Sequence, residues 1–508
     1  MSGGPGRDRS VNLVDGDLVK PLVVLSIPIV LTNLLQVGYN LADTFWVGRL
    51  GQAAVSALSF SWAIVFLIIS LAAGFTVAGT VLVAQYKGAG NSDKIGRVAG
   101  QTISFIVLLS AVLSAGGYFL APNMLQLVGA VPGTEEFALS VAYTRTMFLG
   151  IPFVFGFFIF MSLLQGWGDS RTPLYLMFFG VALNVLIDPL FILGFQDNIL
   201  FSVLGLESLE ASLYAATGFT GWGVQGAALA TISSRGIGAV IGFWLLLSGR
   251  VGIALSLADF KLRSETVRKI IEIGTPASIE QSTIALSTTV LTALVAIAGA
   301  EAVAAYGIGT RVTSLVVLPA LGLQRGVEAA VGQNLGANKA TRAKRAVFAA
   351  VGLTVASLIV MSGAIFVSAG SIVDVFITGA SAAAVIELGT EYLRIVGATY
   401  AFLGAFYIIQ GGFRGSGSTR TAMIFAILGF IVFRGSLAYV FVDPLTLGAT
   451  GVWYGEAVAN VLMVFVAGLY FLRGSWQDGV VETPSSGVQR DDTTSDDSQS
   501  VPSSGGED

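Results

Sequence analysis

The chain has 508 residues, of which 54% are hydrophobic and only 11% are charged, and its mean hydropathy is +0.80. Because roughly 25% of residues are charged in soluble proteins, this composition excludes an ordinary soluble protein and indicates a chain that lies in a lipid bilayer. The sequence contains no cysteine and no histidine, which excludes disulfides, thiolate or imidazole metal sites, histidine-ligated haem and Ser/His/Asp triads.

Twelve apolar stretches are long enough to cross a bilayer, since a spanning helix needs about 20 mostly apolar residues. We therefore expect an all-α integral membrane protein rather than a β-barrel, whose strands alternate in polarity. The predicted spans begin near Pro21, Val55, Arg97, Phe137, Thr172, Trp222, Lys269, Ala302, Arg345, Glu387, Thr421 and Thr450. The first apolar run lacks a small-residue cleavage pattern, so we expect no removable signal peptide.

The positions of lysine and arginine predict the orientation. With a cytoplasmic N-terminus, 20 of the 27 basic residues fall in cytoplasmic segments, six fall within spans, and only Arg49 falls in an outer loop. The positive-inside rule then predicts a multi-pass protein of the cytoplasmic membrane with both termini in the cytoplasm. An even number of spans requires the same.

An internal duplication divides the spans into two halves. Residues 51–57 (GQAAVSA) recur as 299–305 (GAEAVAA), residues 166–172 recur as 415–421, Pro28 aligns with Pro276, and Tyr143 aligns with Tyr392. Residues 223–226 also match 448–451, at a smaller offset. Six spans per repeat give both halves one orientation, which predicts two six-helix lobes related by a pseudo-two-fold axis along the membrane normal, with a substrate cavity between them.

The domain organisation follows from the spans and the repeat. We expect a cytoplasmic N-terminal segment (1–20), an N-lobe (21–250), a cytoplasmic linker (251–268), a C-lobe (269–475) and an acidic cytoplasmic tail (476–508). The smaller offset indicates an outer-loop insertion at about 195–221 in the N-lobe. The tail is expected to be disordered because it combines serine, threonine and proline with eight acidic residues and one arginine.

Parallel six-helix repeats favour a transporter that works by alternating access over a simple pore. The sequence has no motif typical of an ion-channel selectivity filter. It also lacks the phosphate-binding loop of an ATPase. We therefore expect an ion gradient to be the energy source.

Ionisable residues inside the spans are functional candidates, because a charge at the helix centre costs at least about 2.5 kcal/mol. Asp43 lies in the first span and Asp188 in the fifth, where Asn184 shares its helix face. Both aspartates lie five or six residues before a terminal glycine, roughly 8 to 9 Å below the outer interface. Tyr143 and Thr231 lie a few residues into the fourth and sixth spans, at a similar depth in the membrane. The oxygens of Asp43, Asn184, Asp188 and Thr231 could bind an alkali cation such as Na⁺. Alternatively, one of the two close carboxylates could hold a proton. The sequence does not distinguish a sodium site from a proton site.

The repeat serves as an internal control on this site. Asp43, Asn184 and Asp188 fall opposite Leu291, Phe433 and Leu437. A network that only fixes helix packing should occur in both copies, so a functional role is favoured. The second half has its own acids, Glu280 and Glu456, which are either a second ion or substrate site or groups at helix ends. Aromatic residues such as Tyr39 and Phe157 are more typical of packing or lipid contacts than of a cavity wall.

These motifs together resemble the multidrug and toxic compound extrusion (MATE) family, in its archaeal and DinF-like branch, over residues 15–475. The likeness rests on Pro28, on residues 40–48 (NLADTFWVG), 165–173 (QGWGDSRTP), 184–189 (NVLIDP) and 226–231 (GAALAT), and on 331–337 (VGQNLGA). The resemblance implies a V-shaped antiporter that exports organic cations in exchange for Na⁺ or H⁺. It also implies that Asp43 and Asp188 are the functional aspartates, that Asn184, Tyr143 and Thr231 are their polar neighbours, and that Pro28 is a bending point.

The resemblance also implies the partners of the protein. They would be small organic cations and membrane lipids, with no nucleic acid and no cofactor beyond the coupling ion, and the protein would be a monomer. Arginine outnumbers lysine 20 to 7, the tail is acidic and cysteine is absent, which would suit a salt-adapted prokaryote such as a haloarchaeon.

Two alternatives to this function are considered. A flippase for lipid-linked oligosaccharides has a related architecture, but it should show a strongly cationic central cavity, and few arginines lie within the spans. A membrane-embedded acyl or glycosyl transferase is disfavoured because no histidine is present and because the acids lie at the outer level of the membrane.

Overall fold

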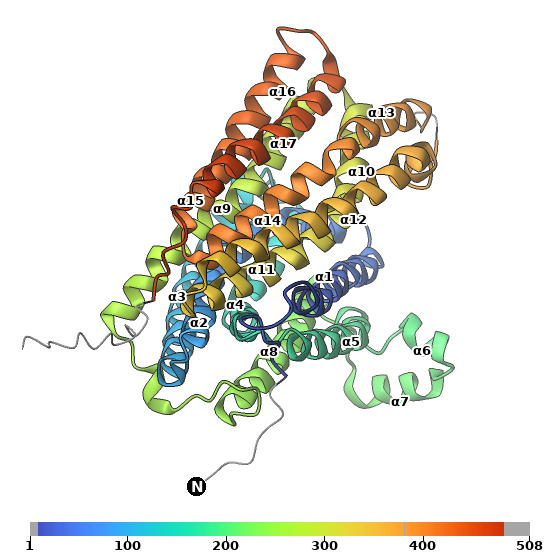
Figure 1. The fold of residues 1–508 in the computed structure, drawn as a ribbon. Coiled ribbons are helices and arrows are strands. Elements are labelled where there is room, and N and C mark those ends of the chain that lie inside the picture. The colour runs from blue at the N-terminus through green and yellow to red at the C-terminus, as the bar shows by residue number, and fades with distance from the viewer. Residues whose placement is uncertain (1–8, 380–381, 482–508) are drawn as a thin grey trace, which may run out of the picture.

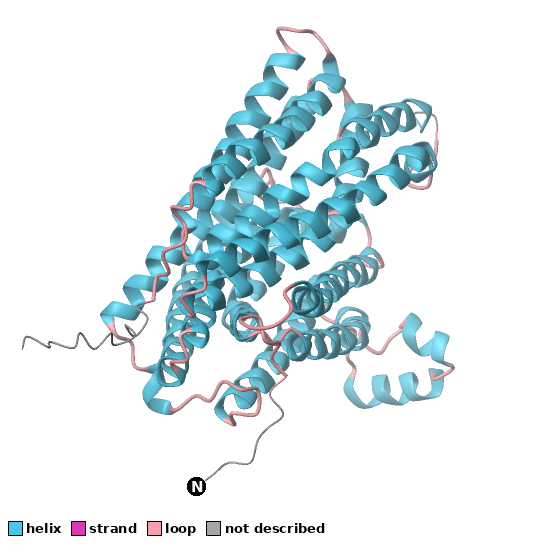
Figure 2. Cartoon of the chain, viewed as in Figure 1, coloured by secondary structure: helices cyan, strands magenta, loops and turns pink. Residues whose placement is uncertain are grey.

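The computed structural model describes residues 9–379 and 382–481. All regular secondary structure in these residues is helical (Figure 2). The first half contains α1 (Val19–Gly48), α2 (Gln52–Gly88), α3 (Ser92–Leu127), α4 (Glu135–Trp167), α5 (Arg171–Leu193), α6 (Ile199–Leu204), α7 (Glu207–Thr217) and α8 (Val224–Leu247). The second half contains η1 (Leu257–Phe260), α9 (Ser264–Ala296), α10 (Ala300–Val316), α11 (Leu318–Gly336), α12 (Ala340–Asp374), α13 (Ala382–Ile395), η2 (Gly397–Thr399), α14 (Tyr400–Ser416), α15 (Thr419–Ala426), η3 (Ile427–Phe433), α16 (Arg434–Val442) and α17 (Gly448–Leu472).

These helices confirm the predicted all-α membrane fold with twelve spans. Eleven helical segments of the described chain are long and apolar enough to cross a membrane, and α10 with α11 forms a twelfth span that bends by 44°. The bend falls just before Pro319 in the first turn of α11. Proline has no backbone N–H and disfavours the helical conformation of the residue before it, which explains why this span is broken.

The duplication seen in the sequence is also present in the backbone. Gly51 and Gly299 precede α2 and α10 with φ angles of 106° and 112°. Gly168 and Gly417 end α4 and α14 in the left-handed conformation, with φ angles of 89° and 88°. Only glycine adopts such angles without strain. Each repeat therefore begins and ends equivalent helices with the same backbone geometry.

The two lobes form the legs of a V (Figure 1). They meet at what we call the basic end. Most of the lysines and arginines lie at this end, in the loops after α2, α4, α8, α11 and α14 and in the helix turns that adjoin these loops. At this end, the backbones of α2 and α11 touch at Gly88 and Gly336. Further along α2, Gly74 lies against Ser278 of α9. At the opposite end, α10, α16 and α17 diverge from α1 and α5 (Figure 1).

Close packing of α8 on α5 sets the frame of the N-lobe site. Gly226, at the start of α8, lies so close to the carbonyl oxygen of Phe191 on α5 that a Cβ atom there would stand 2.2 Å from it. The equivalent Gly451 of α17 packs in the same way on Phe441 of α16. Small residues allow helix backbones to approach closely in membranes. Further along α8 stands Thr231, whose hydroxyl lies 3.5 Å from the Asp43 carboxylate of α1.

The insertion in the N-lobe forms two short helices, α6 and α7, which project beyond the end of α5 (Figure 1). Its base is an edge-to-face cluster of Phe195, Phe201 and Phe219 with Trp222. Asn198 is buried, and its amide donates to the carbonyl oxygens of Pro189 (2.9 Å) and Gly194 (2.7 Å). The insertion therefore holds the end of the helix that carries Asp188.

Candidate functional site

A polar cluster lies inside the N-lobe, where α1, α5 and α8 meet. It contains Asp43 of α1, Asn184 and Asp188 of α5, and Thr231 of α8, and none of these residues is more than 9% exposed. The amide of Asn184 donates to Oδ1 of Asp188 at 2.9 Å. The Asp43 and Asp188 carboxyl groups lie within hydrogen-bonding reach of each other. The structure therefore brings together four of the residues singled out in the sequence.

Tyr39 joins this cluster, although its sequence context predicted a packing residue. Its hydroxyl donates to Oγ1 of Thr231 at 2.5 Å. The Thr231 hydroxyl in turn lies 3.5 Å from Oδ2 of Asp43. Tyr39 stands four residues before Asp43 and thus on the same helix face, which is the sequence signal that could have identified it.

Tyr143 of α4, also predicted to belong to the site, lies at the edge of the cluster. Its side chain is 2% exposed and packs in an apolar group with Val47 and Val224. Asp43 and Asp188 are its charged neighbours. Its ring thus closes one side of the cluster against the outer part of the N-lobe.

A buried arginine lies one helical turn from Thr231. Arg235 is 4% exposed, and its guanidinium donates to Oε1 of Gln36 at 2.5 Å and to the sulfur of Met177 at 3.0 Å. It also lies over the rings of Tyr39 and Phe157, 4.8 Å from each centroid, an arrangement that stabilises a cation. The sequence predicted that Arg235 lies within a span, but it gave no indication of a role for this residue. Two carboxylates and one guanidinium leave a net charge of −1 when both acids are ionised, so one monovalent cation balances the cluster.

Three oxygens of the cluster have no hydrogen-bond partner in the described chain. They are Oδ1 of Asp43, Oδ1 of Asn184 and Oδ2 of Asp188, and all are buried. Buried polar atoms in folded proteins are normally paired, because an unpaired one loses its hydration without compensation. Oxygens of this kind can accept a hydrogen bond or coordinate a cation. They come from Asp43, Asn184 and Asp188, which the second repeat replaces with Leu291, Phe433 and Leu437, respectively.

The three buried acids of the C-lobe, Glu280, Glu328 and Glu456, are arranged differently, because each is paired with an arginine. Glu280 of α9 accepts two hydrogen bonds from Arg414 of α14, at 2.7 and 3.0 Å. The same guanidinium donates to Glu328 of α11 at 3.0 Å, and Glu328 also pairs with Arg325 at 3.0 Å. Glu280 is thus the partner of a buried cation that belongs to the protein itself.

Glu456 of α17 has a similar environment. Arg434 of α16 lies 3.4 Å from its carboxylate and donates to the amide oxygen of Asn460 at 2.8 Å. The hydroxyl of Tyr392, the repeat equivalent of Tyr143, lies 3.5 Å from the same carboxylate. The C-lobe therefore supplies a resident guanidinium where the N-lobe leaves carboxylate oxygens unpaired.

Pro28 lies on the part of α1 that faces the C-lobe. The helix continues through it, and the hydroxyl of Thr32 donates to its carbonyl oxygen at 2.8 Å. Nearby, Ser26 and Val30 pack against Gly326 and Gly322 of α11. A proline inside a helix removes one backbone hydrogen bond, so α1 is weakened where it crosses the partner lobe.

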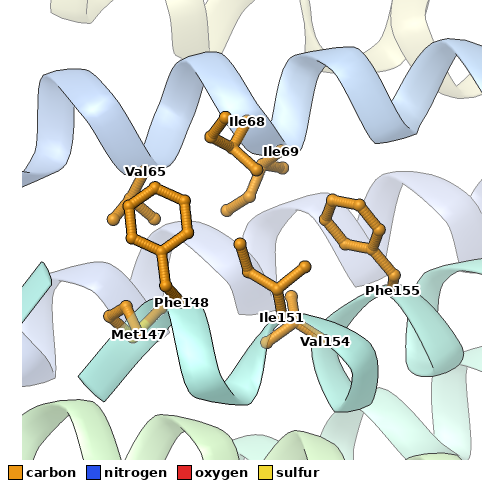
Figure 3. A pocket seen from close by; sticks show the side chains of 8 residues that line it. All are labelled: Val65, Ile68, Ile69, Met147, Phe148, Ile151, Val154 and Phe155. Atoms are coloured by element: carbon orange, nitrogen blue, oxygen red, sulfur yellow. The ribbon is translucent and has the colours of Figure 1, made fainter. Parts of the chain in front are cut away.

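An apolar cavity within the N-lobe is a poor candidate for substrate binding. It lies between α2 and α4, is lined by side chains such as Ile68, Phe148 and Phe155 (Figure 3), and measures about 10 Å³. A cavity of about 10 to 15 Å³ is just large enough for one water molecule. We therefore assign it to imperfect packing of the lobe.

Comparison with known proteins agrees with this architecture. The model of the MatE family matches residues 28–190 and 276–440, one match in each lobe. The chain is 27% identical over 475 residues to the probable multidrug resistance protein YpnP of Bacillus subtilis (strain 168), covering 92% of this chain and 98% of that protein. It is 26% identical over 460 residues to the multidrug export protein MepA of Staphylococcus aureus (strain NCTC 8325 / PS 47), covering 89% and 94%. A solved structure described as the outward-facing conformation of a multidrug resistance MATE family transporter of the MOP superfamily matches with a TM-score of 0.81 and 25% identity, covering 92% of this chain and 98% of that chain.

Proposed function

This chain belongs to the MatE family of membrane transporters, and from that premise we propose that it exports organic cations in exchange for Na⁺ or H⁺, which binds at Asp43 and Asp188. Relatives in the family are multidrug transporters rather than enzymes. Substrate movement would occur by alternating access of the cavity between the lobes. All residues of the cation cluster come from one lobe of one chain, so a monomer suffices, and no cofactor beyond the ion is needed.

The observation that carries this proposal is the set of unpaired oxygens on Asp43, Asn184 and Asp188. A bound Na⁺ would be coordinated by such hard oxygen ligands, and a proton would be shared between the two neighbouring carboxyl groups. In either case the added positive charge offsets the excess of two carboxylates over the Arg235 guanidinium. The coupling ion would be cargo, which enters from one side and leaves on the other.

The orientation follows from the distribution of charge. The basic end carries most of the lysines and arginines, and the positive-inside rule assigns it to the cytoplasm. The lobes are closed at that end and diverge at the other, so this conformation faces outward. The cation cluster lies nearer to the outer end, where an ion from outside would reach it first.

Coupling requires the ion to bind the two conformations unequally. The cluster is shared by α1, α5 and α8, so a cation bound between them favours the conformation in which these helices are close together. Because α1 also crosses α11 of the C-lobe near Pro28, a change at Asp43 can alter the wall of the central cavity. Entry of the ion would then promote release of the organic cation to the outside.

The test is efflux of ethidium from proteoliposomes with Na⁺ and H⁺ gradients imposed separately. We expect one gradient to drive efflux and Asp43→Asn and Asp188→Asn to abolish it while the protein remains folded. Asp443→Asn is the matched control, because Asp443 is exposed beyond the end of α16. Gradient-driven efflux retained by both cluster variants would contradict the proposed site.

The same experiment addresses the flippase alternative. Arg414 and Arg434 are each paired with glutamates, so they do not present the free positive charge that a lipid-linked oligosaccharide phosphate needs. No ethidium efflux under either gradient, from wild-type protein shown to be folded, would nevertheless favour the flippase over the antiporter.

A further inference from the structure

Two glutamines at the basic end occupy equivalent positions in the two repeats. Gln85 lies near the end of α2 and Gln333 near the end of α11, and both side chains are at most 1% exposed. Both glutamines lie in the pattern V-x-Q-x-x-G-A, which occurs at residues 83–89 (VAQYKGA) and 331–337 (VGQNLGA). The proposed cation site in the N-lobe makes no use of this motif.

Each glutamine donates hydrogen bonds to the opposite lobe. Nε2 of Gln85 in the N-lobe donates to the carbonyl oxygens of Gly415 (3.2 Å) and Ser416 (3.1 Å) at the end of α14. Nε2 of Gln333 in the C-lobe donates to the carbonyl oxygen of Gly166 (3.0 Å) near the end of α4. The last carbonyls of a helix have no partner within that helix. Each lobe thus satisfies the helix end of the other, through residues that are themselves related by the repeat.

The same crossing depends on two glycines that are also equivalent. A Cβ atom at Gly88 would lie 1.9 Å from the carbonyl oxygen of Gln333, and one at Gly336 would lie 1.9 Å from that of Gln85. No side chain other than hydrogen fits at these positions without a shift of the backbone. The glycines therefore set the distance at which the two amides reach across.

The two ends of the described chain complete this arrangement. Oε1 of Gln85 accepts hydrogen bonds from the backbone N–H groups of Val480 (2.8 Å) and Val481 (3.2 Å). Next to Gln333, the amide of Asn334 donates to the carbonyl oxygen of Leu13 at 2.9 Å. Val11 of the same segment donates to the carbonyl oxygen of Gly168, beyond α4. Residues 9–17 and 477–481 thus each connect one lobe to the other.

From these contacts we infer that Gln85 and Gln333 form a two-part lock that holds the basic end closed. Residues 9–17 and 477–481 stabilise the closed end by further contacts between the lobes. The inference rests on the proposed alternating access, because the lock must open for the cavity to face the other side. The three cross-lobe hydrogen bonds from the glutamines break together when α2 and α11 separate. Loss of either glutamine should therefore shift the population toward the conformation that is open at the basic end.

Because the chain contains no cysteine, one introduced thiol can report the opening. Ser26 of α1 is 3% exposed, its hydroxyl has no hydrogen-bond partner in the described chain, and it faces Gly326 of α11. A thiol at Ser26→Cys can react with a hydrophilic maleimide only when the lobes part. Ser26 lies on a different helix from both glutamines, and its contact Gly326 stands seven residues, about two helical turns, before Gln333 on α11. The thiol therefore does not line the space that either glutamine side chain would leave.

We expect Gln85→Ala and Gln333→Ala each to raise the labelling rate of the Ser26→Cys protein at least about tenfold. Gln101→Ala is the matched control, because Gln101 is equally buried but accepts a hydrogen bond from the backbone of Arg263 in the linker beside its own lobe. Gly88→Ala keeps both glutamines but separates the helices, and should raise the rate as well. A chain that ends at Trp476 should label faster than one that ends at Val481.

Labelling in detergent needs neither a drug nor an ion gradient, so its outcome is independent of the ethidium experiment. If Gln85→Ala, Gln333→Ala and Gly88→Ala, all shown to be folded by thermal unfolding, label at the wild-type rate, the lock is refuted. Equal acceleration by Gln101→Ala would also refute it, because general loosening of a lobe would then explain the effect.

Discussion

Removal of Arg414 tests whether the C-lobe acids are stabilised by a resident cation. Arg414 is 3% exposed and makes three hydrogen bonds, two to Glu280 and one to Glu328. With Arg325, these residues make a network of two positive and two negative charges. Arg414→Met keeps much of the side-chain volume but leaves the network with a net charge of −1 in a buried position.

The expected cost follows from this geometry. Removing one partner of a buried ion pair destabilises a protein by about 3–5 kcal/mol, because the other charge stays buried without compensation. The double variant Arg414→Met with Glu280→Gln restores neutrality, since Arg325 still pairs with Glu328. One oxygen of Glu328 then lacks its partner, which costs about 1–3 kcal/mol. The double variant should therefore be more stable than the single one.

Thermal unfolding of the purified protein in detergent measures this difference. For units of about 150–250 residues, 1 kcal/mol shifts Tm by roughly 2–4 °C, so Arg414→Met should lower the Tm of the C-lobe by roughly 6–20 °C. Arg311→Met, at an exposed position on α10, is the control and should leave Tm nearly unchanged. A single variant as stable as the wild type, or a double variant less stable than the single, would refute the assignment of Arg414 as the resident cation.

Two further predictions concern the N-lobe site and the N-terminal segment. Thr231→Val keeps the shape of the side chain but removes the hydroxyl that Tyr39 and Asp43 share, so the ion concentration for half-maximal ethidium efflux should rise, with about 1–3 kcal/mol lost from ion binding; an unchanged ion dependence would remove Thr231 from the site. The Lys339 ammonium, which hydrogen-bonds Asp15 at 2.6 Å, holds the pKa of that exposed carboxyl below its ordinary value. A carboxyl group whose pKa is lowered by folding stabilises the folded state above its unfolded-state pKa, and this stabilisation is lost as the pH falls through its folded-state pKa. The protection of the backbone amides in residues 9–17 against hydrogen exchange, relative to intrinsic exchange at each pH, should thus stay constant from about pH 6 to about pH 8 and fall only below about pH 4. Loss of protection that begins near neutral pH would contradict this.

Local features of the sequence predicted most of the fold. A span is a continuous apolar run of known length, so its existence depends on no distant contact. The repeat added the symmetry, because Gly51 and Gly299 or Gly168 and Gly417 need the same backbone angles in both copies. The bend between α10 and α11 is also local, and Pro319 is its signal.

The contacts between spans were less accessible to sequence reasoning. Asp43 and Asp188 could be placed at one depth by counting residues, which is why their proximity was predicted. The partners of Glu280 and Glu456 could not be predicted in this way. Arg414 and Arg434 lie on helices whose rotation about their own axes is set by packing, and residue counting does not give that rotation. The cross-lobe contacts of Gln85 and Gln333 depend on the conformation as well as the fold, and no local pattern encodes them.

The difference between the lobes bears directly on how an ion could be coupled to transport. Glu456 stands at the repeat position of Thr231, and its charge is met by Arg434, a cation that cannot leave. In the N-lobe, Arg235 contacts Gln36 and Met177, while one oxygen each of Asp43 and Asp188 has no hydrogen-bond partner among the described residues. Under the proposed function, the guanidinium keeps the charge of the C-lobe constant, whereas the charge of the N-lobe changes when an ion enters or leaves. Under the proposed function, only the N-lobe can then register the ion gradient, and the C-lobe provides the constant surface against which α1 moves.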